Sequence, residues 1–309
     1  MTRAILLGNH TVAVRALDAL RACAEVCAVV AHPEDPEDGV RYASLYGKAA
    51  ALGIPTYRLA GREPALAELV AEHRPELLLS VDYRYRVPTQ IIATPGVMAI
   101  NFHPGLLPRY RGRAPVNWAI LNGERELGLT AHVMEEGIDC GDIVAQERFE
   151  LGEEEDVGDA LQKLYPLYER MVRSVVGHVA SGTIPRQPQD HAQATTYPRR
   201  RPEDGLIDWH QPARNVHRLV RAVAAPYPGA FAWWGGAKIL VWKARVADSR
   251  PVAPPGSVTR WVGRDGFEVA CGSGALEVTR WSVEGGRKDD PRPRLGTRLA
   301  CEEMGAVHV

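Results

Sequence analysis

The sequence predicts an α/β domain with a mostly parallel sheet, followed by a smaller β domain that is rich in turns. In the first half of the 309-residue chain, short β-like runs alternate with helical patterns. This alternation is typical of a parallel sheet covered by helices. Beyond residue 205, short strand-like runs follow one another with turn signals between them, which favours a small barrel or sandwich.

The elements of the first half follow in a regular order. A strand is predicted at 3–8 (RAILLG) and a helix at 12–23 (VAVRALDALRAC). The next elements are a strand at 26–32, helices at 44–53 and 64–73, strands at 77–83 and 96–102, a helix at 115–123 and a strand at 127–135. The apolar runs ILL, CAVV and LLLSV are continuous, which is typical of strands buried on both faces.

A long amphipathic helix is predicted over 157–180. Its apolar residues recur mostly at intervals of three or four: Val157, Leu161, Leu164, Met171, Val175 and Val179. Gly182 should close the helix. Pro166 should bend it, because proline removes one backbone donor and clashes with the preceding turn.

The composition then changes to a polar stretch that contains several prolines. We interpret residues 188–205 as a linker between a first domain at 1–187 and a second domain at 206–309. The second domain should open with a helix at 213–224. Its predicted strands lie at 229–234, 237–246, 256–262, 266–272 and 275–283.

Charge and cysteine usage limit the class of protein. Lys and Arg number 37 against 38 Asp and Glu, so the formal net charge of -1 creates no global field toward nucleic acid or an anionic membrane. The five cysteines (Cys23, Cys27, Cys140, Cys271, Cys301) contain no CxxC pair, which favours a reduced chain. We find no signal-peptide pattern and no apolar run of about eighteen residues, and we therefore expect a soluble cytoplasmic protein.

The stretch INFHPGLLPRYRGRAP (100–115) places an amide and an imidazole at the end of a predicted strand. Side chains alternate along a strand, so Asn101 and His103 should share one face while Phe102 enters the core. Pro104 cannot donate to a ladder, so pairing should end there. In a parallel sheet the carboxyl ends of strands border the ligand crevice, and we expect the polar pair to face it.

Two donors that converge on one point suit acyl transfer. The Asn101 amide and a protonated His103 can both donate to an oxygen that becomes negative in a tetrahedral intermediate. A nearby carboxylate would favour the charged imidazole and orient it. The best source is the loop MEEGIDCGDI, with its four acids Glu135, Glu136, Asp139 and Asp142.

Other interpretations of these residues stay open at this point. An Asn-x-His pair also caps turns, and an acidic loop is often merely solvated. His103, His132 and an aspartate could bind a metal, but HxxxH and CxxC spacings are lacking, so we predict no metal. The first βα turn has Gly8 but no GxGxxG, which argues against a dinucleotide site. The residues alone therefore indicate an α/β enzyme with an acyl-transfer site, and no substrate.

Residues 100–146 resemble the core of the formyltransferases that use 10-formyltetrahydrofolate. They combine the Asn-x-His pair, the LLPxxRG loop and the GxDxGDI turn at a separation that is specific to this family. The resemblance extends over nearly the whole chain, since 255–278 is similar to the family's OB-like C-terminal domain. It implies a mostly parallel, Rossmann-like catalytic domain followed by a small OB-like β-barrel.

The resemblance also implies roles for individual residues. His103 would be the central catalytic residue, Asn101 would stabilise the oxyanion, and Asp139 would raise the pKa of the histidine, with Asp142 as the competing carboxylate. The folate co-substrate would contact Tyr85, Arg86, Val87, Arg113, Glu135, Glu136, Gly137, Ile138 and Asp139. The reaction would need a neutral amine that attacks the formyl carbon and a proton for the departing folate nitrogen.

The chain departs from the family pattern in two places. Gly105 stands where many relatives have a serine, so a hydroxyl contact is lost there. The run Arg84-Tyr85-Arg86 is more basic than a pterin pocket alone requires.

The branches of the family differ in the amine that they formylate. Segments 83–88, 111–124 and 199–233 resemble the enzyme that acts on UDP-4-amino-4-deoxy-L-arabinose. We therefore expect a primary amine on a nucleotide-linked sugar, with His10 and Arg84 as candidate contacts to it.

Three alternatives to this acceptor remain. The first is methionyl-tRNA formylation, which is supported by the arginines 199–201 and opposed by the segment 32–50, whose leading stretch has four acids and no base. The second is N-hydroxyornithine formylation in a siderophore pathway. The third is a folate-binding module without catalysis. We expect no membrane partner, and a homodimer stays open.

Overall fold

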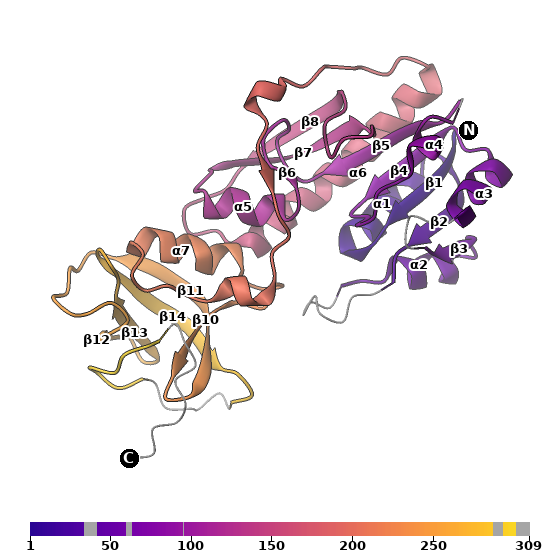
Figure 1. Cartoon of the computed structure of the whole chain (residues 1–309). Helices are drawn as coiled ribbons and strands as arrows, with labels where there is room; N and C mark the ends of the chain where they lie inside the picture. Colours follow the sequence, from indigo (N-terminus) through magenta and orange to yellow (C-terminus); the bar gives the residue numbers. More distant parts are fainter. Residues whose placement is uncertain (34–41, 60–63, 95, 287–292, 301–309) are drawn as a thin grey trace.

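Two sheets organise the protein, and a long connecting segment joins them (Figure 1). The computed structural model describes residues 1–33, 42–59, 64–94, 96–286 and 293–300. Within these residues, the N-terminal part has a seven-stranded sheet and the C-terminal part a five-stranded one. The acidic stretch that opposes a tRNA substrate (34–41) and Cys301 lie outside the described residues.

The N-terminal sheet has the order β3-β2-β1-β4-β5-β7-β8. Its strands are β1 (Arg3–Gly8), β2 (Glu25–Ala31), β3 (Thr56–Arg58), β4 (Leu77–Val81), β5 (Met98–His103), β7 (Glu126–Val133) and β8 (Ile143–Glu150). The first five pair in parallel, whereas β7 and β8 run antiparallel to their neighbours. The prediction of a mostly parallel α/β sheet is therefore confirmed.

Helices bury both faces of this sheet. Ala4 and Leu6 of β1 join the core beneath α1 (His10–Arg21), α2 (Leu45–Ala51) and α6 (Val157–Ser181). Ile5 and Leu7 face the opposite core, beneath α3 (Pro64–His73) and α4 (Thr89–Ile92). Because successive side chains alternate between two cores, the strand has to be apolar at every position from Ala4 to Leu7.

Helix α6 follows the predicted amphipathic pattern. Its first turn is capped by Asp156, whose carboxylate accepts the N–H groups of Gly158 and Asp159. Its last turn ends at Gly182, with φ at 68°. Pro166 lies inside the helix.

Phe102 anchors the end of β5 in the core. The residue is 1% exposed, and its ring stacks on Tyr168 of α6 with 6.2 Å between the centroids. This placement fixes which face of β5 carries Asn101 and His103, because neighbouring side chains point the opposite way.

The second sheet is antiparallel in the order β10-β11-β14-β13-β12. Its strands are β10 (Ala230–Trp234), β11 (Ala237–Ala247), β12 (Val258–Val262), β13 (Gly266–Ala270) and β14 (Ala275–Val283). Helix α7 (Ala213–Ala222) packs between β11 and α5 (Pro115–Leu121), and Asn117 of α5 donates to the Ala222 carbonyl at 2.7 Å. The small antiparallel β domain that the sequence predicted is confirmed.

The segment after α6 runs back along the N-terminal sheet before it reaches the second domain (Figure 1). Gln187 exchanges two backbone hydrogen bonds with Ile143 at the start of β8. Strand β9 (Thr196–Tyr197) pairs in parallel with β6 (Arg111–Gly112), and a 3-10 turn (Pro202–Gly205) then leads into the second domain. This segment therefore touches loops of the N-terminal part on its way.

Two further observations concern the whole described chain. Within it, no helix combines the length and the apolar character that a membrane crossing requires. The four described cysteines, Cys23, Cys27, Cys140 and Cys271, all carry free thiols.

Candidate active site

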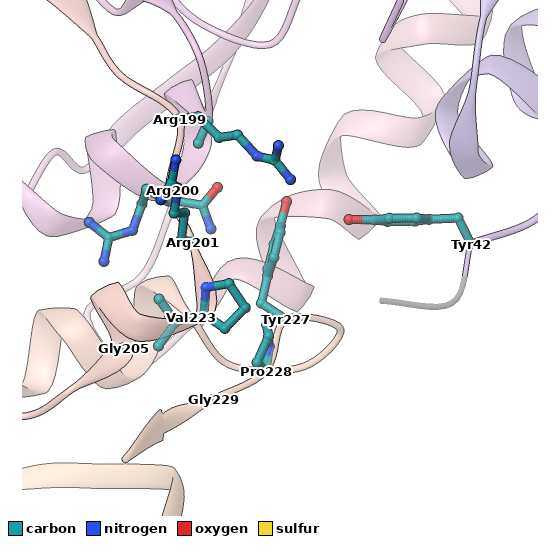
Figure 2. A pocket seen from close by; sticks show the side chains of 12 residues that line it. Tyr42, Arg199, Arg200, Arg201, Gly205, Val223, Tyr227, Pro228 and Gly229 are labelled. Carbon is teal, nitrogen blue, oxygen red and sulfur yellow. The ribbon is translucent and has the colours of Figure 1, made fainter. Parts of the chain in front are cut away.

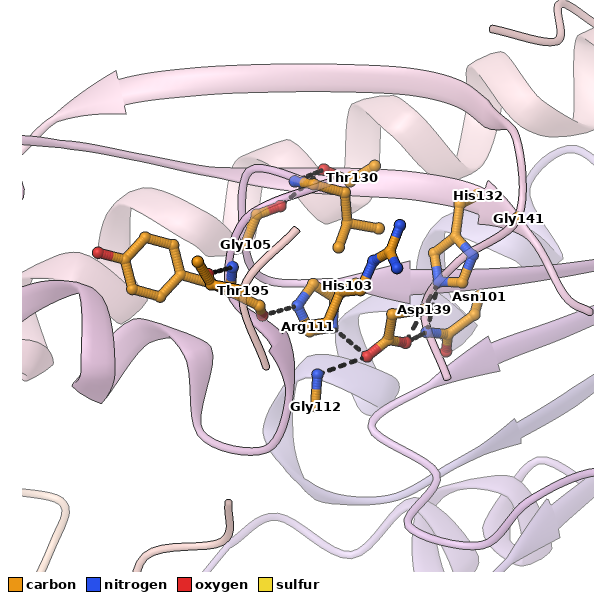
Figure 3. Close-up of polar contacts among 12 residues, drawn as sticks. Asn101, His103, Gly105, Arg111, Gly112, Thr130, His132, Asp139, Gly141 and Thr195 are labelled. Atoms are coloured by element: carbon orange, nitrogen blue, oxygen red, sulfur yellow. Dashed lines mark hydrogen bonds and ion pairs between the residues drawn. The ribbon is translucent and has the colours of Figure 1, made fainter. Parts of the chain in front are cut away.

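Strand β5 delivers Asn101 and His103 to the carboxyl edge of the sheet (Figure 3). Its antiparallel neighbour β7 places His132 opposite Asn101 and Thr130 opposite His103. The register between β5 and β7 therefore brings four polar residues together: Asn101 and His103 on one strand, His132 and Thr130 on the other.

The carboxylate of Asp139 lies at the centre of this group (Figure 3). Its Oδ2 accepts the backbone N–H of Gly112 at 2.8 Å and lies 3.5 Å from Nδ1 of His103. Its Oδ1 lies 3.4 Å from both Asn101 Nδ2 and His132 Nε2. The three residues that the family resemblance singles out, Asn101, His103 and Asp139, are thus brought together.

The main chain determines which nitrogen of His103 carries hydrogen. Nε2 lies 2.7 Å from the carbonyl oxygen of Tyr110, so this nitrogen is a donor. In the neutral ring, Nδ1 is then the proton acceptor, and it faces Asp139. A proton that arrives at Nδ1 would lie next to the carboxylate, which stabilises it.

Burial and charge act in opposite directions on this pair. Burial lowers the pKa of His103, which is 4% exposed, and outweighs the Asp139 carboxylate, which raises it. Asp139 therefore raises the pKa of His103, as predicted, but the pKa is lower than its ordinary value because burial has the larger effect. Burial alone would raise the pKa of Asp139, but the charge of a protonated His103 and the Gly112 N–H hold it well below its ordinary value. The carboxylate is thus ionised, and the ring gives up an added proton readily.

His132 is a member of the site that the sequence suggested only as a metal ligand. Its Nδ1 lies 2.9 Å from the Val133 carbonyl oxygen, which makes Nδ1 the donor and leaves Nε2 to accept from Asn101 Nδ2 at 3.1 Å. This bond orients the Asn101 amide with its NH2 group toward the Asp139 carboxylate. Within the described residues, no set of three His, Cys, Asp or Glu side chains is arranged to hold a metal ion.

Thr130 and Gln146 hold the loop that follows His103. The Thr130 hydroxyl donates to the Gly105 carbonyl at 2.6 Å and accepts from Gln146 Nε2 at 2.9 Å. Gln146 also donates to the Leu107 carbonyl at 3.0 Å. A Cβ on Gly105 would lie 2.9 Å from Nε2 of His103, so glycine at this position gives the ring its space.

The residues expected to contact folate gather beside the site. The Arg86 guanidinium donates to the Glu136 carbonyl, and Arg113 Nη2 donates to the Arg84 carbonyl at 2.9 Å. Glu135, Glu136, Gly137 and Ile138 are exposed, and Ile138 keeps 57% of its surface accessible. The Tyr85 ring packs edge-on against His32, whereas Val87 is buried and can offer little more than its backbone.

His10 and Asp82 form a second polar pair at the ends of β1 and β4. Nδ1 of His10 lies 2.6 Å from Asp82 Oδ2, and the His10 ring stacks on Tyr42 with 3.7 Å between the centroids. Burial lowers the pKa of the neighbouring His32, and the charge of Arg84 adds to that shift. The two candidate acceptor contacts, His10 and Arg84, therefore lie around one buried histidine.

Asp142 lies apart from the central group. Its carboxylate is 3.9 Å from Arg186, and its backbone carbonyl accepts from the Val133 N–H at 2.9 Å. Of the two competing aspartates, the structure thus directs only Asp139 toward the imidazole.

An amide, an imidazole and an ionised carboxylate at the carboxyl edge of a parallel sheet define an acyl-transfer type of site. The chain belongs to the formyl transferase family: residues 3–176 match its formyl transferase domain and residues 200–292 match its C-terminal domain. It is accordingly a formyltransferase-family enzyme, as the resemblance predicted.

Solved structures of similar fold include sugar-modifying enzymes. An N-formyltransferase from Helicobacter canadensis is 18% identical, with 91% of this chain and 100% of that chain covered and a TM-score of 0.66. The sugar 3N-formyltransferase WlaRD is 16% identical, with 90% and 97% covered and a TM-score of 0.65. A variant of HypX from Aquifex aeolicus is 19% identical over 91% of this chain, with a TM-score of 0.61; the chain spans 45% of the HypX length.

Proposed function

We propose that this enzyme transfers a formyl group from 10-formyltetrahydrofolate to a primary amine on a nucleotide-linked sugar. The observation that carries the proposal is the convergence of Asn101, His103 and Asp139 within one hydrogen-bonded group. In the reaction, a bond forms between the amine nitrogen and the formyl carbon, and the bond from that carbon to the folate nitrogen breaks. The amine loses one proton and the folate nitrogen gains one.

His103 carries the proton between these two nitrogens in this mechanism. Its lowered pKa leaves Nδ1 unprotonated at neutral pH, so the ring is a base when the amine attacks. Asp139 next to Nδ1 stabilises the imidazolium that results. The same burial that lowers the pKa favours release of the proton to the departing nitrogen.

Asn101 stabilises the oxygen of the formyl group. One amide hydrogen is directed at His132, and the other reaches Asp139 Oδ1 over the longer distance of 3.4 Å. A formyl oxygen that enters the site would take over this weaker contact as it becomes negative. Removal of one such donor typically costs about 3 kcal/mol of transition-state stabilisation.

Folate as the donor of the formyl group is supported by the similar structures. The enzyme from Helicobacter canadensis is in complex with folinic acid and dTDP-3-aminofucose, and HypX has been solved in complex with tetrahydrofolic acid. In this chain, the exposed loop Glu135–Ile138 and the backbone of Tyr85–Val87 flank the site and would hold the pterin.

A cationic cavity supports a nucleotide-linked acceptor. The cavity has about 110 Å³, and its polar lining includes Tyr42, Arg199, Arg200, Arg201 and Tyr227. Figure 2 shows the Arg199 guanidinium and the hydroxyls of Tyr42 and Tyr227 pointing toward one another. Ala114, two residues from the Gly112 N–H that binds Asp139, also lines it. Whole small-molecule sites usually have about 300–1,000 Å³, so this cavity suits one part of a ligand, such as a diphosphate.

Arg200 is built into the wall of this cavity. Its guanidinium lies 4.9 Å from the Trp118 ring centroid, and Nη2 donates to the Asp204 carbonyl at 2.7 Å. Its Nε is buried and has no hydrogen-bond partner within the described part of the chain. An incoming phosphate oxygen is a suitable acceptor for such a group.

Replacement of Arg199 tests the cavity. Arg199→Met should raise KM for a nucleotide-linked amino sugar about tenfold and leave kcat nearly unchanged, because the diphosphate binds equally in the ground and transition states. Formylation of the same amino sugar without its nucleotide should be unaffected. Arg280→Met, on an exposed position of β14, is the matched control. An unchanged KM in Arg199→Met would remove the cavity from the proposal.

One experiment tests the acceptor class directly. The protein is incubated with 10-formyltetrahydrofolate and a panel of amines, and the products are weighed by mass spectrometry. The panel contains dTDP- and UDP-linked amino sugars, N-hydroxyornithine and charged initiator tRNA. We expect formylated amino-sugar nucleotides. Robust formylation of the tRNA or of N-hydroxyornithine would replace this acceptor, and folate binding without any product would indicate a non-catalytic module.

A further inference from the structure

A buried glutamine, Gln189, contacts the main chain of the loop that carries Asp139. Gln189 is 6% exposed, although it lies in the polar stretch between the two domains. Its Nε2 donates to the carbonyl of Asp139 at 2.9 Å and to the carbonyl of Gly141 at 2.7 Å. One side-chain amide therefore holds the backbone on both sides of Cys140.

Arg111 holds the other end of the same amide. Oε1 of Gln189 accepts from Arg111 Nη2 at 2.6 Å and from Arg111 Nε at 3.3 Å. Arg111 is 9% exposed, and its Nη2 also lies 2.9 Å from Nδ1 of His191. A flipped amide would direct its NH2 toward the guanidinium and its oxygen toward two carbonyls, so only one orientation satisfies all groups.

The backbone of Asp139 needs such support. Its φ is 50°, in the left-handed region that residues other than glycine rarely adopt. The two hydrogen bonds from Gln189 hold the carbonyl groups that would reorient if Asp139 relaxed.

The segment that contains Gln189 also holds the second contact to the carboxylate. The Arg111 N–H donates to the Thr195 carbonyl at 2.8 Å, and the Arg113 N–H donates to the Tyr197 carbonyl at 3.0 Å. The N–H of Gly112 between them points the other way, to Asp139 Oδ2. Residues 187–197 thus fix both the loop that carries the carboxylate and the donor that orients it.

We propose that Gln189 is a positioning residue for formyl transfer, which sets the Asp139 carboxylate against the His103 imidazole through the main chain of the 139–141 loop. The inference rests on the proposed function for its kinetic consequence. Gln189 touches neither the imidazole nor the carboxylate, and its effect on the reaction is exerted through the position of Asp139.

Two variants and one control test this proposal. Gln189→Met keeps a similar length and removes all of the hydrogen bonds. Gln189→Glu keeps the acceptor for Arg111 and loses both donors to the loop, so it also serves if the methionine variant fails to fold. Gln193→Met is the matched control, because Gln193 lies on the same segment, is exposed and donates from its side chain to Asp190, away from the loop.

The first readout is kinetic. Misplacement of a catalytic group by about 1 Å can lower turnover about 100-fold, and we expect kcat to fall about 10- to 100-fold in both Gln189 variants. KM for the acceptor amine should stay within about twofold, and Gln193→Met should behave as the wild type. A merely structural role would change the unfolding temperature without this separation of kcat from KM.

The second readout needs no turnover. Because the Asp139 carboxylate raises the pKa of His103, its displacement should lower that pKa further, as followed by ¹⁵N NMR of the histidine rings. Equal kcat values and equal His103 titrations in Gln189→Met, Gln189→Glu and Gln193→Met would overturn the proposal. If the wild type formylates no amine, the proposed function fails, and the NMR titration still decides whether Gln189 positions Asp139.

Discussion

The backbone N–H of Gly112 donates to Oδ2 of Asp139 over 2.8 Å, and so joins two loops that are far apart in the chain. Gly112 has a φ of 92°, and a Cβ at this position would collide with the carbonyl of Tyr197. The donor thus comes from a position that only glycine fits, because of both its backbone conformation and its close neighbour.

Gly112→Ala should separate β6 from β9 and move the donor away from Asp139. We expect kcat to fall about 100-fold, in line with a displacement of about 1 Å. Gly53→Ala is the control, since Gly53 has a φ of 70° but a Cβ there would meet no atom of the described residues within 4 Å. Steady-state kinetics of both variants check the prediction, and equal activity in the two variants would show that Gly112→Ala leaves the donor to Asp139 in place.

His103→Ala and Asp139→Ala should abolish turnover and leave the fold intact. General acid–base catalysis contributes about 10²–10⁴-fold, so formyl transfer should fall at least 100-fold in either variant. Circular dichroism should match the wild type. Asp142→Ala is the matched control, because its carboxylate faces Arg186 instead of the imidazole. Full activity in either of the first two variants would remove the proposed mechanism.

The pH profile should report the lowered pKa of His103. If the neutral ring is the base, kcat/KM calculated for the unprotonated form of the amine stays constant as the pH falls through 6.5, the ordinary value for histidine, and declines only below it. Removal of a carboxylate that raises this pKa shifts the acid limb to still lower pH, so the residual activity of Asp139→Asn should decline later than that of the wild type. Both profiles are measured with the same amine, so that the protonation of the amine cancels when the two enzymes are compared. An acid limb above pH 6.5 in the wild type would contradict this assignment.

Gly105→Ser introduces the residue that the family resemblance leads us to expect, and it should lower activity here. The added Cβ would lie 2.9 Å from His103 Nε2 and 3.2 Å from the Pro115 Cβ, which forces the ring away from the Tyr110 carbonyl. The loss of that hydrogen bond, about 1 kcal/mol, corresponds to a decrease in kcat of about fivefold. Gly105→Ala should behave alike, because the crowding comes from the Cβ. Wild-type activity in the serine variant alone would show that a hydroxyl contact compensates.

Phe102→Ala should lower the free energy of unfolding of the protein strongly. The side chain is 1% exposed and stacks on Tyr168, and truncation of such a residue typically costs about 3–5 kcal/mol. Urea denaturation measures the change. Phe149→Ala, on the half-buried edge strand β8, should cost clearly less. Equal losses in the two variants would mean that Phe102 does not anchor the strand.

The buried helices and strands could be predicted from the sequence because their apolar side chains form recognisable runs and periodic patterns. The strands β1 and β4 each contain a continuous apolar run, Ala4–Leu7 and Leu77–Leu79, and α3 has the predicted limits of 64–73. Strand β8 was missed because it lies at an edge and carries charged residues such as Glu147 and Arg148. The strands β3, β6 and β9 are too short for a periodic pattern. The domain limits at residues 187 and 206 remain predictions.

The site could be predicted only in part. The motif spacing indicated Asn101, His103 and Asp139, but His132 joins them through the register between β5 and β7, which no local pattern encodes. Gln189 lies in a polar stretch, and the sequence of such a stretch does not distinguish a buried glutamine from an exposed one. The downward shift of the His103 pKa comes from burial, which depends on the whole fold.

The left-handed backbone positions gather at the functional edge of the sheet. Among the described residues other than glycine, the positive φ values belong to His10, Arg74, Asp82, Tyr110, Ala114 and Asp139, and all of these but Arg74 lie at or next to the polar groups described above. Each costs of the order of 1–3 kcal/mol, which the surrounding packing has to offset. Robustness and catalytic preorganisation therefore compete in this enzyme. Ala114→Gly would relieve the backbone and heighten thermal tolerance, at the expense of a cleft that is already shaped before its ligands arrive.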